Sequence, residues 1–383
     1  MAGIYLHIPF CKKACYYCDF HFSTSTRYKE EMLRALQSEI RLQQHYLGNK
    51  TIETIYFGGG TPSLLSADEL QILIDQIEQI YNVSQTAEIT LEANPDDLIP
   101  QKIKELRQTP INRFSVGIQS FFEEDLKWMN RAHTASEAES SVKRIQDAGF
   151  ENITLDLIYG YPLLSNEKWS ENIRKVLELG VPHVSAYSMT VEPATALASF
   201  IRKGKQQPMN EAQSAEQFMM LMNNLTEGGF EQYEISNFAR PGKFSIHNSN
   251  YWKGVHYLGI GPSAHSYNGE TRQWNIANNS QYIDSIEKKV VPAEVEILTP
   301  ANRLNEYIMT SLRTSWGMDL YWISTTFSPE IASETEKNLS GFMEKDWIKI
   351  DNNLVTLTVK GKLYADYIAS ELFIEPEMVN KLT

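Results

Sequence analysis

Cysteine is scarce in this sequence, which has only Cys11, Cys15 and Cys18 among 383 residues. An odd number of cysteines excludes a complete internal disulfide framework. All three lie within one stretch of eight residues, and random scatter would bring three cysteines this close in about one sequence in a thousand. The three cysteines therefore act together.

Long apolar runs are also missing. No uninterrupted apolar run approaches the roughly 18 residues that a membrane-spanning helix needs. The first ten residues, MAGIYLHIPF, lack the basic region and the long apolar core of a secretory signal. We therefore expect a cytoplasmic protein.

Positive charge is in the minority. Lysine and arginine number 35 against 48 aspartates and glutamates, which gives a formal charge of −13. A nucleic-acid partner held by counterion release is therefore not expected. Glycine and proline number only 20 and 15, while 42% of the residues are hydrophobic. This is the composition of a globular protein, and the chain is long enough for two domains.

What the sequence does contain is an alternation of short β-branched or aromatic runs with longer amphipathic stretches, which is typical of βα units on a parallel sheet. Ser66 and Glu69 form a helix-starting capping box, and Gly149 and Gly180 suit helix ends. Six strands are predicted, over residues 4–8, 52–57, 87–93, 113–118, 153–159 and 183–189, with a weaker one over 233–236 and helices over 27–46, 67–80, 134–148 and 166–179.

The pattern changes near residue 285. Helices are predicted near 279–288, 300–313 and 328–345, followed by a hairpin of WIKI and LVTLTV around residues 351–353 and a last helix over 361–373. Helices followed by a hairpin suggest a small winged-helix-like domain. We therefore predict a first domain over residues 1–285 and a C-terminal domain over residues 286–383.

Polar or glycine residues follow nearly every predicted strand. Ligands of parallel βα sheets and barrels bind at the carboxyl ends of the strands, so these residues are candidates for function. Asp156 is the most informative, because a carboxylate in an apolar strand is costly without a partner or a ligand. The strand ends supply the three cysteines, Gly58 to Gly60 with Thr61 and Pro62, Glu92 with Asn94, Gln119, Asp156 and Glu192.

Some of these residues also have simpler interpretations. The three glycines are equally consistent with a flexible turn and with backbone N–H groups left open to a ligand. Glu92 is open to a structural pairing. Arg131 lies in the segment WMNRAH. An arginine in such a position is more often a solvated charge on a helix than a residue that binds a ligand carboxylate.

The cysteines admit two metal centres. His21 follows Cys18 and would complete a Cys3His zinc site. Three thiolates can instead hold three irons of a [4Fe–4S] cluster and leave the fourth iron without a protein ligand. The aromatic neighbours Tyr16, Tyr17 and Phe20, and the position at a catalytic-looking rim, favour the cluster.

The cysteines form a C-x3-C-x-aromatic-C motif, with Tyr17 before the last cysteine, and this motif resembles the signature of radical S-adenosylmethionine (SAM) enzymes. From residue 4 to about 267 the chain is similar to the oxygen-independent coproporphyrinogen III oxidase family, most closely to its HemW branch of haem chaperones. The resembling segments are YLHIPFCKKACYYCDF, YFGGGTPSLL, ITLEANPDDL, SVGIQSF, LDLIYGYP, YEISNFARPG and HNSNYW.

The resemblance implies a fold, cofactors and their sites. The fold would be a partial (β/α)6 TIM-type radical SAM barrel with a small helical C-terminal domain. Cys11, Cys15 and Cys18 would ligate a [4Fe–4S] cluster whose open iron takes SAM. The SAM molecule would contact Tyr5, Tyr17, Gly59, Gly60, Thr61, Glu92, Gln119, Arg131 and Asp156.

Two features separate the two branches of the family. The oxidase branch has a fourth cysteine two residues beyond the third, where this chain has Phe20. The HemW branch has an H-N-x-x-Y-W motif, which is matched here from His247 to Trp252. The resemblance therefore implies a haem chaperone in which His247 is an axial haem ligand, because imidazole is a natural ligand of haem iron.

The expected partners are haem and acceptor haemoproteins, such as membrane-associated proteins of a respiratory chain. The alternative function is the oxidative decarboxylation of coproporphyrinogen III in porphyrin biosynthesis. A zinc-binding module without redox chemistry is the third.

Overall fold

The computed structural model describes residues 1–376. Its largest feature is a sheet whose central strands are parallel and adjacent in chain order. These strands confirm the six predicted ones, with small shifts at their ends. They are β1 (Ala2–Ile8), β2 (Ile52–Gly59), β3 (Val83–Ala93), β4 (Arg113–Gln119), β5 (Asn152–Tyr159) and β6 (His183–Ser188).

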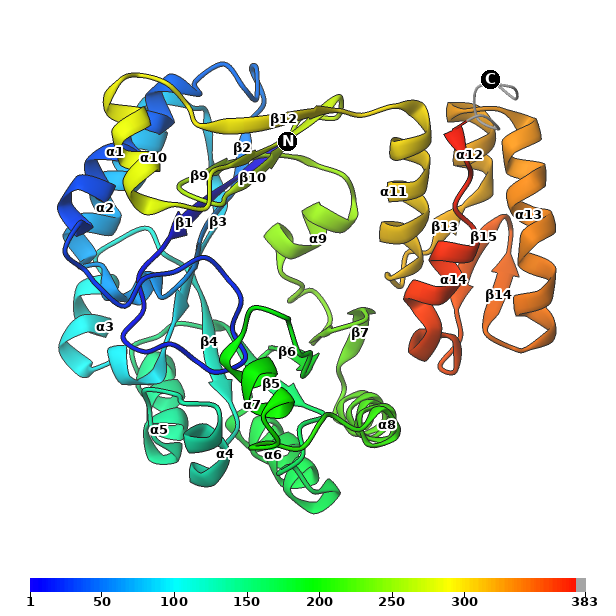
Figure 1. The fold of residues 1–383 in the computed structure, drawn as a ribbon, viewed down its shortest axis with the longest axis horizontal. Helices are drawn as coiled ribbons and strands as arrows, with labels where there is room; N and C mark the ends of the chain where they lie inside the picture. Colours follow the sequence, from blue (N-terminus) through cyan, green and yellow to red (C-terminus); the bar gives the residue numbers. More distant parts are fainter. Residues whose placement is uncertain (377–383) are drawn as a thin grey trace.

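Helices connect the parallel strands and lie on their outer side (Figure 1). Helix α2 begins at the predicted capping box, where the Ser66 side chain accepts from the Glu69 backbone N–H. Helix α6 ends at Gly180, which has a φ of 67°. The connecting helices are α1 (Lys29–Leu42), α2 (Ala67–Ile80), α3 (Pro100–Leu106), α4 (Glu123–Trp128), α5 (Ala135–Asp147) and α6 (Asn166–Leu179), with 3-10 turns at Pro62–Leu64 and Pro95–Asp97.

The hydrophobic core of the barrel lies between these strands and helices. Ile4, Phe57, Leu91 and Phe114 on the strands are fully buried together with helix residues such as Leu73. Both faces of the parallel strands are largely buried, which explains why the strands read as nearly continuous apolar runs. Polar residues inside such strands are therefore exceptions.

Further strands extend the sheet at both edges, and the sequence predicted little of this. The weak candidate 233–236 corresponds to two short strands, β7 (Glu231–Glu234) and β8 (Asn237–Ala239), with β8 antiparallel to β6. Strand β9 (His256–Ile260) is parallel to β1. The other elements of this region are α7 (Ala196–Arg202), α8 (Glu211–Glu227), α9 (Ile246–Trp252), β10 (His265–Tyr267), β11 (Thr271–Asn275), α10 (Asn279–Glu287) and β12 (Ala293–Ile297).

The C-terminal part has the element order helix, strand, helix, helix and hairpin of a winged-helix arrangement, followed by a last helix (Figure 1). Asn352 and Asn353 have positive φ angles of 48° and 69°, as a tight hairpin turn requires. The elements are α11 (Pro300–Leu312), β13 (Met318–Asp319), α12 (Leu320–Thr326), α13 (Pro329–Glu344), β14 (Ile348–Asp351), β15 (Leu354–Leu357), a 3-10 turn (Gly361–Tyr364) and α14 (Ala365–Glu371).

The border between the two parts lies later than the predicted residue 285. Ile286 of α10 belongs to the core of the barrel part, and β12 pairs with β11 in the large sheet. The second hydrophobic cluster begins at Ala301. We therefore propose a border near residue 298. Among the described helices, none is long and apolar enough to cross a membrane.

Candidate functional site

The three cysteines lie on the loop that follows β1 and crosses the open face of the barrel part (Figure 1). Backbone hydrogen bonds fix this loop: Cys11 N–H donates to the Ser23 carbonyl over 3.0 Å, and Tyr16 N–H donates to the Met129 carbonyl over 3.1 Å. Lys12 forms an ion pair of 2.6 Å with Asp96, beyond the end of β3. The loop is therefore held against the ends of other strands.

The cysteine side chains are partly buried and unpaired. Thr61 Oγ1 donates to Cys11 Sγ over 3.5 Å, and Arg131 Nη1 donates to Cys15 Sγ over 3.4 Å. Burial, with the nearby charges of the other two cysteines, raises the pKa of Cys18 to about 12. The donor set fits a [4Fe–4S] cluster: three soft sulfur ligands, with hydrogen-bond donors aimed at two of them.

His21, the fourth ligand of the zinc alternative, is engaged elsewhere. His21 Nε2 is hydrogen-bonded to Asn279 Oδ1 over 2.7 Å. Within residues 1–376, no group of three or more histidine, cysteine, aspartate or glutamate side chains is arranged to hold a metal ion. A closed Cys3His site is thus not preformed, and the thiols themselves are not drawn together on one centre.

Two carboxyl groups lie inside the barrel, at the strand positions that the sequence singled out. Tyr56 donates to Glu92 Oε1 over 2.8 Å, and burial raises the pKa of Glu92 to about 8, with a further contribution from the charge of Asp156. Ser115 Oγ lies 3.2 Å from both oxygens of Asp156, whose pKa burial raises to about 7. Both groups therefore favour a cation or hydrogen-bond donors beside them.

Arg131 is not a solvated helix charge. It follows α4, and its Nη2 donates to Asn94 Oδ1 over 2.6 Å and to the Gly117 carbonyl over 2.8 Å. Its Nε is buried and has no partner among the described residues. Gln119, with a φ of 66°, ends β4 beside it. Arg131 thus brings a positive charge to the cysteine loop and the strand ends.

The glycines at the end of β2 pack closely against the end of β1 and the start of the cysteine loop, and they do not form a flexible turn. A Cβ atom on Gly59 would lie 2.7 Å from the His7 ring, and one on Gly60 would lie 2.6 Å from the Phe10 carbonyl oxygen. The backbone N–H of Gly60 is not open to a ligand, because it donates to the Ile8 carbonyl, and Thr61 N–H likewise donates to the Phe10 carbonyl. These bonds fasten β2 to the start of the cysteine loop.

Sequence reasoning missed three residues of this site. Tyr56 and Ser115 donate to the two carboxylates, and a Cβ atom on Gly117 would lie 2.9 Å from Gln119 Nε2 and 3.0 Å from Arg131 Nη2. All three lie inside recognised motifs, YFGGGTPSLL and SVGIQSF. The sequence offered one indication of them: each lies on a predicted strand, shortly before the polar or glycine residues at its end.

The H-N-x-x-Y-W motif lies on helix α9. The helix begins here because the Ser245 side chain accepts from Asn248 N–H, and the backbone N–H groups of Ile246 and His247 donate to the buried carboxylate of Glu88. The sequence could not show the partner Glu88, which lies more than 150 residues away.

The His247 side chain points into the barrel part. Nδ1 is hydrogen-bonded to Thr54 Oγ1 over 2.8 Å and Nε2 to Tyr251 Oη over 3.0 Å, and the residue is 3% exposed. Its ring stacks on Tyr56 at 4.8 Å, and Tyr56 stacks on Tyr5. Burial lowers the pKa of His247 to about 3. The His247 ring is therefore neutral, both of its nitrogens are hydrogen-bonded, and it connects α9 to Tyr56 beside the carboxylate of Glu92.

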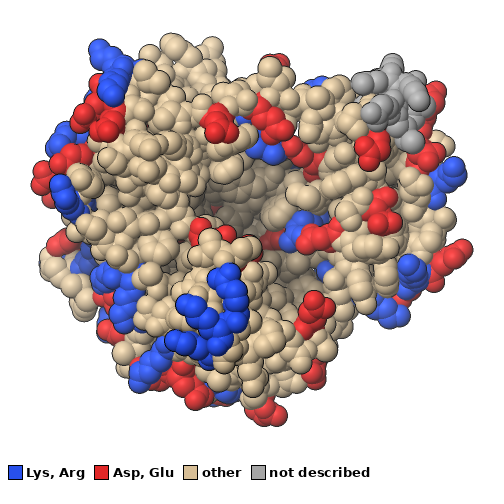
Figure 2. Space-filling model, in the orientation of Figure 1, with Lys and Arg blue, Asp and Glu red and all other residues tan. Residues whose placement is uncertain are grey.

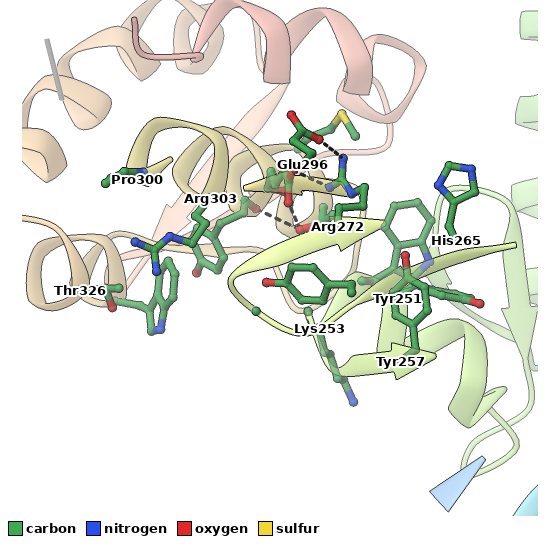
Figure 3. A pocket seen from close by; sticks show the side chains of 18 of the residues that line it. Tyr251, Lys253, Tyr257, His265, Arg272, Glu296, Pro300, Arg303 and Thr326 are labelled. Atoms are coloured by element: carbon green, nitrogen blue, oxygen red, sulfur yellow. Dashed lines mark hydrogen bonds and ion pairs between the residues drawn. The ribbon is translucent and has the colours of Figure 1, made fainter. Parts of the chain in front are cut away.

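Tyr251 and Trp252 of the same motif line a cavity of about 1070 Å³, and Figure 3 shows Tyr251 in its wall. The cavity lies between strands β9 to β12 of the large sheet and helices α11 and α12 of the C-terminal domain. Figure 2 shows that this face of the molecule is hollowed between the barrel part and the C-terminal domain.

The comparisons with known proteins agree with this geometry. Residues 5–176 match the family model of the radical SAM superfamily, and residues 298–364 match that of the HemN C-terminal domain. The chain is 34% identical to the heme chaperone HemW of Bacillus subtilis over 371 residues, which cover 96% of this chain and 98% of that protein. The chain belongs to the HemW family.

Other HemW proteins give similar values. The heme chaperone HemW of Mycobacterium tuberculosis is 32% identical over 97% of this chain and 94% of its own length. The HemW protein of Escherichia coli is 36% identical over 69% of each chain. The solved coproporphyrinogen III oxidase (HemN) of Escherichia coli has a TM-score of 0.83 at 23% identity and covers 97% of this chain and 90% of its own, which establishes a shared fold.

The HemW family membership and the radical SAM domain confirm the predicted family and fold class. A radical SAM domain implies a [4Fe–4S] cluster and SAM as cofactors. The cysteine loop, the two carboxylates and Arg131 all lie within the matched residues 5–176.

Proposed function

We propose that this protein is a haem chaperone with a radical SAM core, which binds haem and transfers it to acceptor haemoproteins. The aromatic cavity beside α9 carries the proposal, because two residues of the H-N-x-x-Y-W motif line it. The similarity to heme chaperones over nearly the whole chain supports it. The acceptors would be haemoproteins such as those of a respiratory chain.

In this proposal the cofactor site is the one at the barrel mouth. Cys11, Cys15 and Cys18 would hold the [4Fe–4S] cluster, which supplies an electron when it is bound and reduced. The residues that would hold SAM beside it are Tyr5, Tyr17, Gly59, Gly60, Thr61, Glu92, Gln119, Arg131 and Asp156.

The chemistry of these side chains suits a zwitterionic amino acid with a ribose. Glu92 and Asp156 accept hydrogen bonds and stabilise a cation such as an ammonium or sulfonium group, whereas Arg131 attracts a carboxylate. The raised pKa values of the two carboxyl groups would fall when such a cation binds, since an opposite charge favours the ionised form. The site would therefore accommodate both charges of SAM.

Haem transfer provides the decisive experiment. The purified protein is titrated anaerobically with haem, and the loaded protein is mixed with the apo form of a b-type cytochrome or with apomyoglobin as a passive haem trap. We expect a stoichiometric Soret change, and transfer to the cytochrome faster than loss to the trap. Equal rates, or no Soret change, would contradict the proposal.

A further inference from the structure

The cavity between the two parts of the molecule has the size and the lining of a macrocycle site. Its volume of about 1070 Å³ is at the upper end of the range for small-molecule sites, roughly 300–1,000 Å³. Aromatic rings can cover a flat apolar ligand with little loss of conformational freedom. Its aromatic lining consists of Tyr251, Trp252, Tyr257, Tyr267, Trp274, Tyr307, Trp322 and Phe327.

One histidine lines this cavity, and it is His265 on β10 (Figure 3). The side chain is exposed, and within residues 1–376 no hydrogen bond engages either ring nitrogen. The ring stacks on Trp274 with centroids 6.1 Å apart. Partial burial and the charge of Arg272 lower the pKa of His265, which favours the neutral imidazole that ligates iron.

His247 lacks these properties. It does not line the cavity, and both of its ring nitrogens are already bonded, one to Thr54 and one to Tyr251. Binding iron would require the loss of a buried hydrogen bond and the displacement of Tyr251. His247 therefore lies behind Tyr251, which lines the cavity, and is not itself part of the cavity wall.

The charges of the cavity suit the propionates of haem. Arg272 is paired with Glu306 at 2.5 Å and lies 4.0 Å from Glu296. Arg303 also lines the cavity, and no ion pair engages it within the described residues. A guanidinium without a carboxylate partner is a natural contact for an anionic carboxylate.

We infer that haem binds in this cavity with His265 as the axial ligand of its iron and Arg303 as a contact for a propionate, while His247 positions Tyr251 from behind. This inference rests on the proposed haem-chaperone function and names the site of binding. It makes the C-terminal domain part of the haem site, because Arg303, Tyr307 and Trp322 come from that domain.

The test compares anaerobic haem titrations of the wild type with those of His265→Ala, His247→Ala, Arg303→Ala and the control His256→Ala. His256 lies on the neighbouring strand β9 but does not line the cavity. The measurements are the Soret position, the EPR spectrum of the ferric complex and the apparent Kd. Iron–sulfur content and circular dichroism check the integrity of each variant.

We expect His265→Ala to lose the histidine-ligated spectrum, to raise the Kd at least tenfold and to regain the histidine-ligated spectrum when free imidazole is added. Arg303→Ala should raise the Kd several-fold with an unchanged spectrum. His256→Ala should behave like the wild type. His247→Ala should retain the ligation spectrum, even if its Kd rises through the loss of support for Tyr251.

Loss of the ligation spectrum in His247→Ala or His256→Ala, with His265→Ala unchanged, would overturn the inference and leave the chaperone function standing. So would tight binding with an unchanged spectrum in all four variants. If the wild type itself binds no haem, the proposed function fails.

Discussion

At the scale of single residues, the two carboxyl groups inside the barrel have raised pKa values, which a bound cation would lower. The pKa of Glu92 is about 8 in the folded protein and about 4.3 in an unfolded chain. Between these values the folded state binds more protons than the unfolded state, so its stability falls as the pH rises. Glu92 therefore destabilises the empty protein at neutral pH, as is typical of binding residues.

Replacing Glu92 with Gln should remove this dependence. The amide keeps an acceptor for Tyr56 but carries no charge, so the variant should be more stable than the wild type at pH 8. The difference should grow between pH 5 and 8 by up to about 1.4 kcal/mol for each pH unit. Urea unfolding of the cofactor-free proteins measures it, with Glu78→Gln on the exposed face of α2 as the control.

The same variant should bind SAM more weakly when the cluster is present, because it has lost a charge that stabilises a cation. A variant as tight as the wild type would remove Glu92 from the proposed SAM site.

The cysteine assignment gives a second prediction at this scale. Anaerobically reconstituted protein should be brown and contain about four iron and four sulfide ions per chain, since a [4Fe–4S] cluster needs three thiolates here. Replacing Cys15 with Ala should abolish the colour, as judged by the visible spectrum and metal analysis. A full cluster in that variant, or bound zinc in a colourless wild type, would contradict the assignment.

The sequence could predict a functional residue where its residue type is unusual for the element in which it lies. Asp156 in an apolar strand and three cysteines in one loop are such cases. Tyr56 and Ser115 could not be found in this way, because hydroxyl groups are common in strands and only the neighbouring strand shows what they contact. The surroundings of His247 could not be predicted, because Thr54, which bonds its ring, and Glu88, which accepts from its backbone N–H, are distant in the sequence.

At the scale of elements, helix α9 lies between the barrel part and the cavity, and one buried carboxylate accepts hydrogen bonds from its first backbone N–H groups. Glu88 on β3 accepts from the backbone N–H groups of Ile246 and His247 and lies 3.7 Å from Arg113, which is 1% exposed. A negative charge at a helix N-terminus is favourable, and here it also balances a buried cation.

Replacing Glu88 with Gln should therefore cost about 3 kcal/mol of unfolding free energy, because it leaves Arg113 buried without its counter-ion. Urea denaturation measures the loss, and hydrogen exchange should show faster exchange at the amides of α9 than at those of α2. Glu216→Ala on the exposed face of α8 should have no measurable effect. A change below about 0.5 kcal/mol in Glu88→Gln would show that α9 is held by its packing instead.

Helices with strong local signals were predicted well, and elements that depend on distant partners were not. Helices α2 and α6 have the predicted limits because their caps are encoded next to them, in Ser66 with Glu69 and in Gly180. Strand β9 was missed, since HYLGI becomes a strand only by pairing with β1 at the far end of the chain. Its partner is over 240 residues away.

At the scale of the whole molecule, the fold class followed from the alternation of strands and helices, whereas the site between the two parts did not. The predicted border at residue 285 separated β12 from the sheet that it extends. The cavity needs both β10 to β12 and α11 to α12, so no local pattern could reveal it. Its residues are ordinary aromatics that only the packing of the two parts brings together.

The fold also cannot decide between the two activities of the wider family, because the HemN oxidase of Escherichia coli shares it with a TM-score of 0.83. A fold does not by itself determine a reaction, and the difference must lie in individual residues. The oxidases that this sequence resembles have a fourth cysteine at the position of Phe20. In this protein the Phe20 side chain is 69% exposed on the surface of the cysteine loop.

We therefore expect no conversion of coproporphyrinogen III to protoporphyrinogen IX when the reconstituted, reduced protein is incubated anaerobically with SAM. Chromatography of the porphyrins measures the products, and the same preparation must contain its full cluster and change its EPR signal when SAM is added. Slow formation of 5′-deoxyadenosine is compatible with both activities. Several turnovers of coproporphyrinogen III would instead make the protein an oxidase, and the aromatic cavity would then be a site for a substrate or product of porphyrin shape.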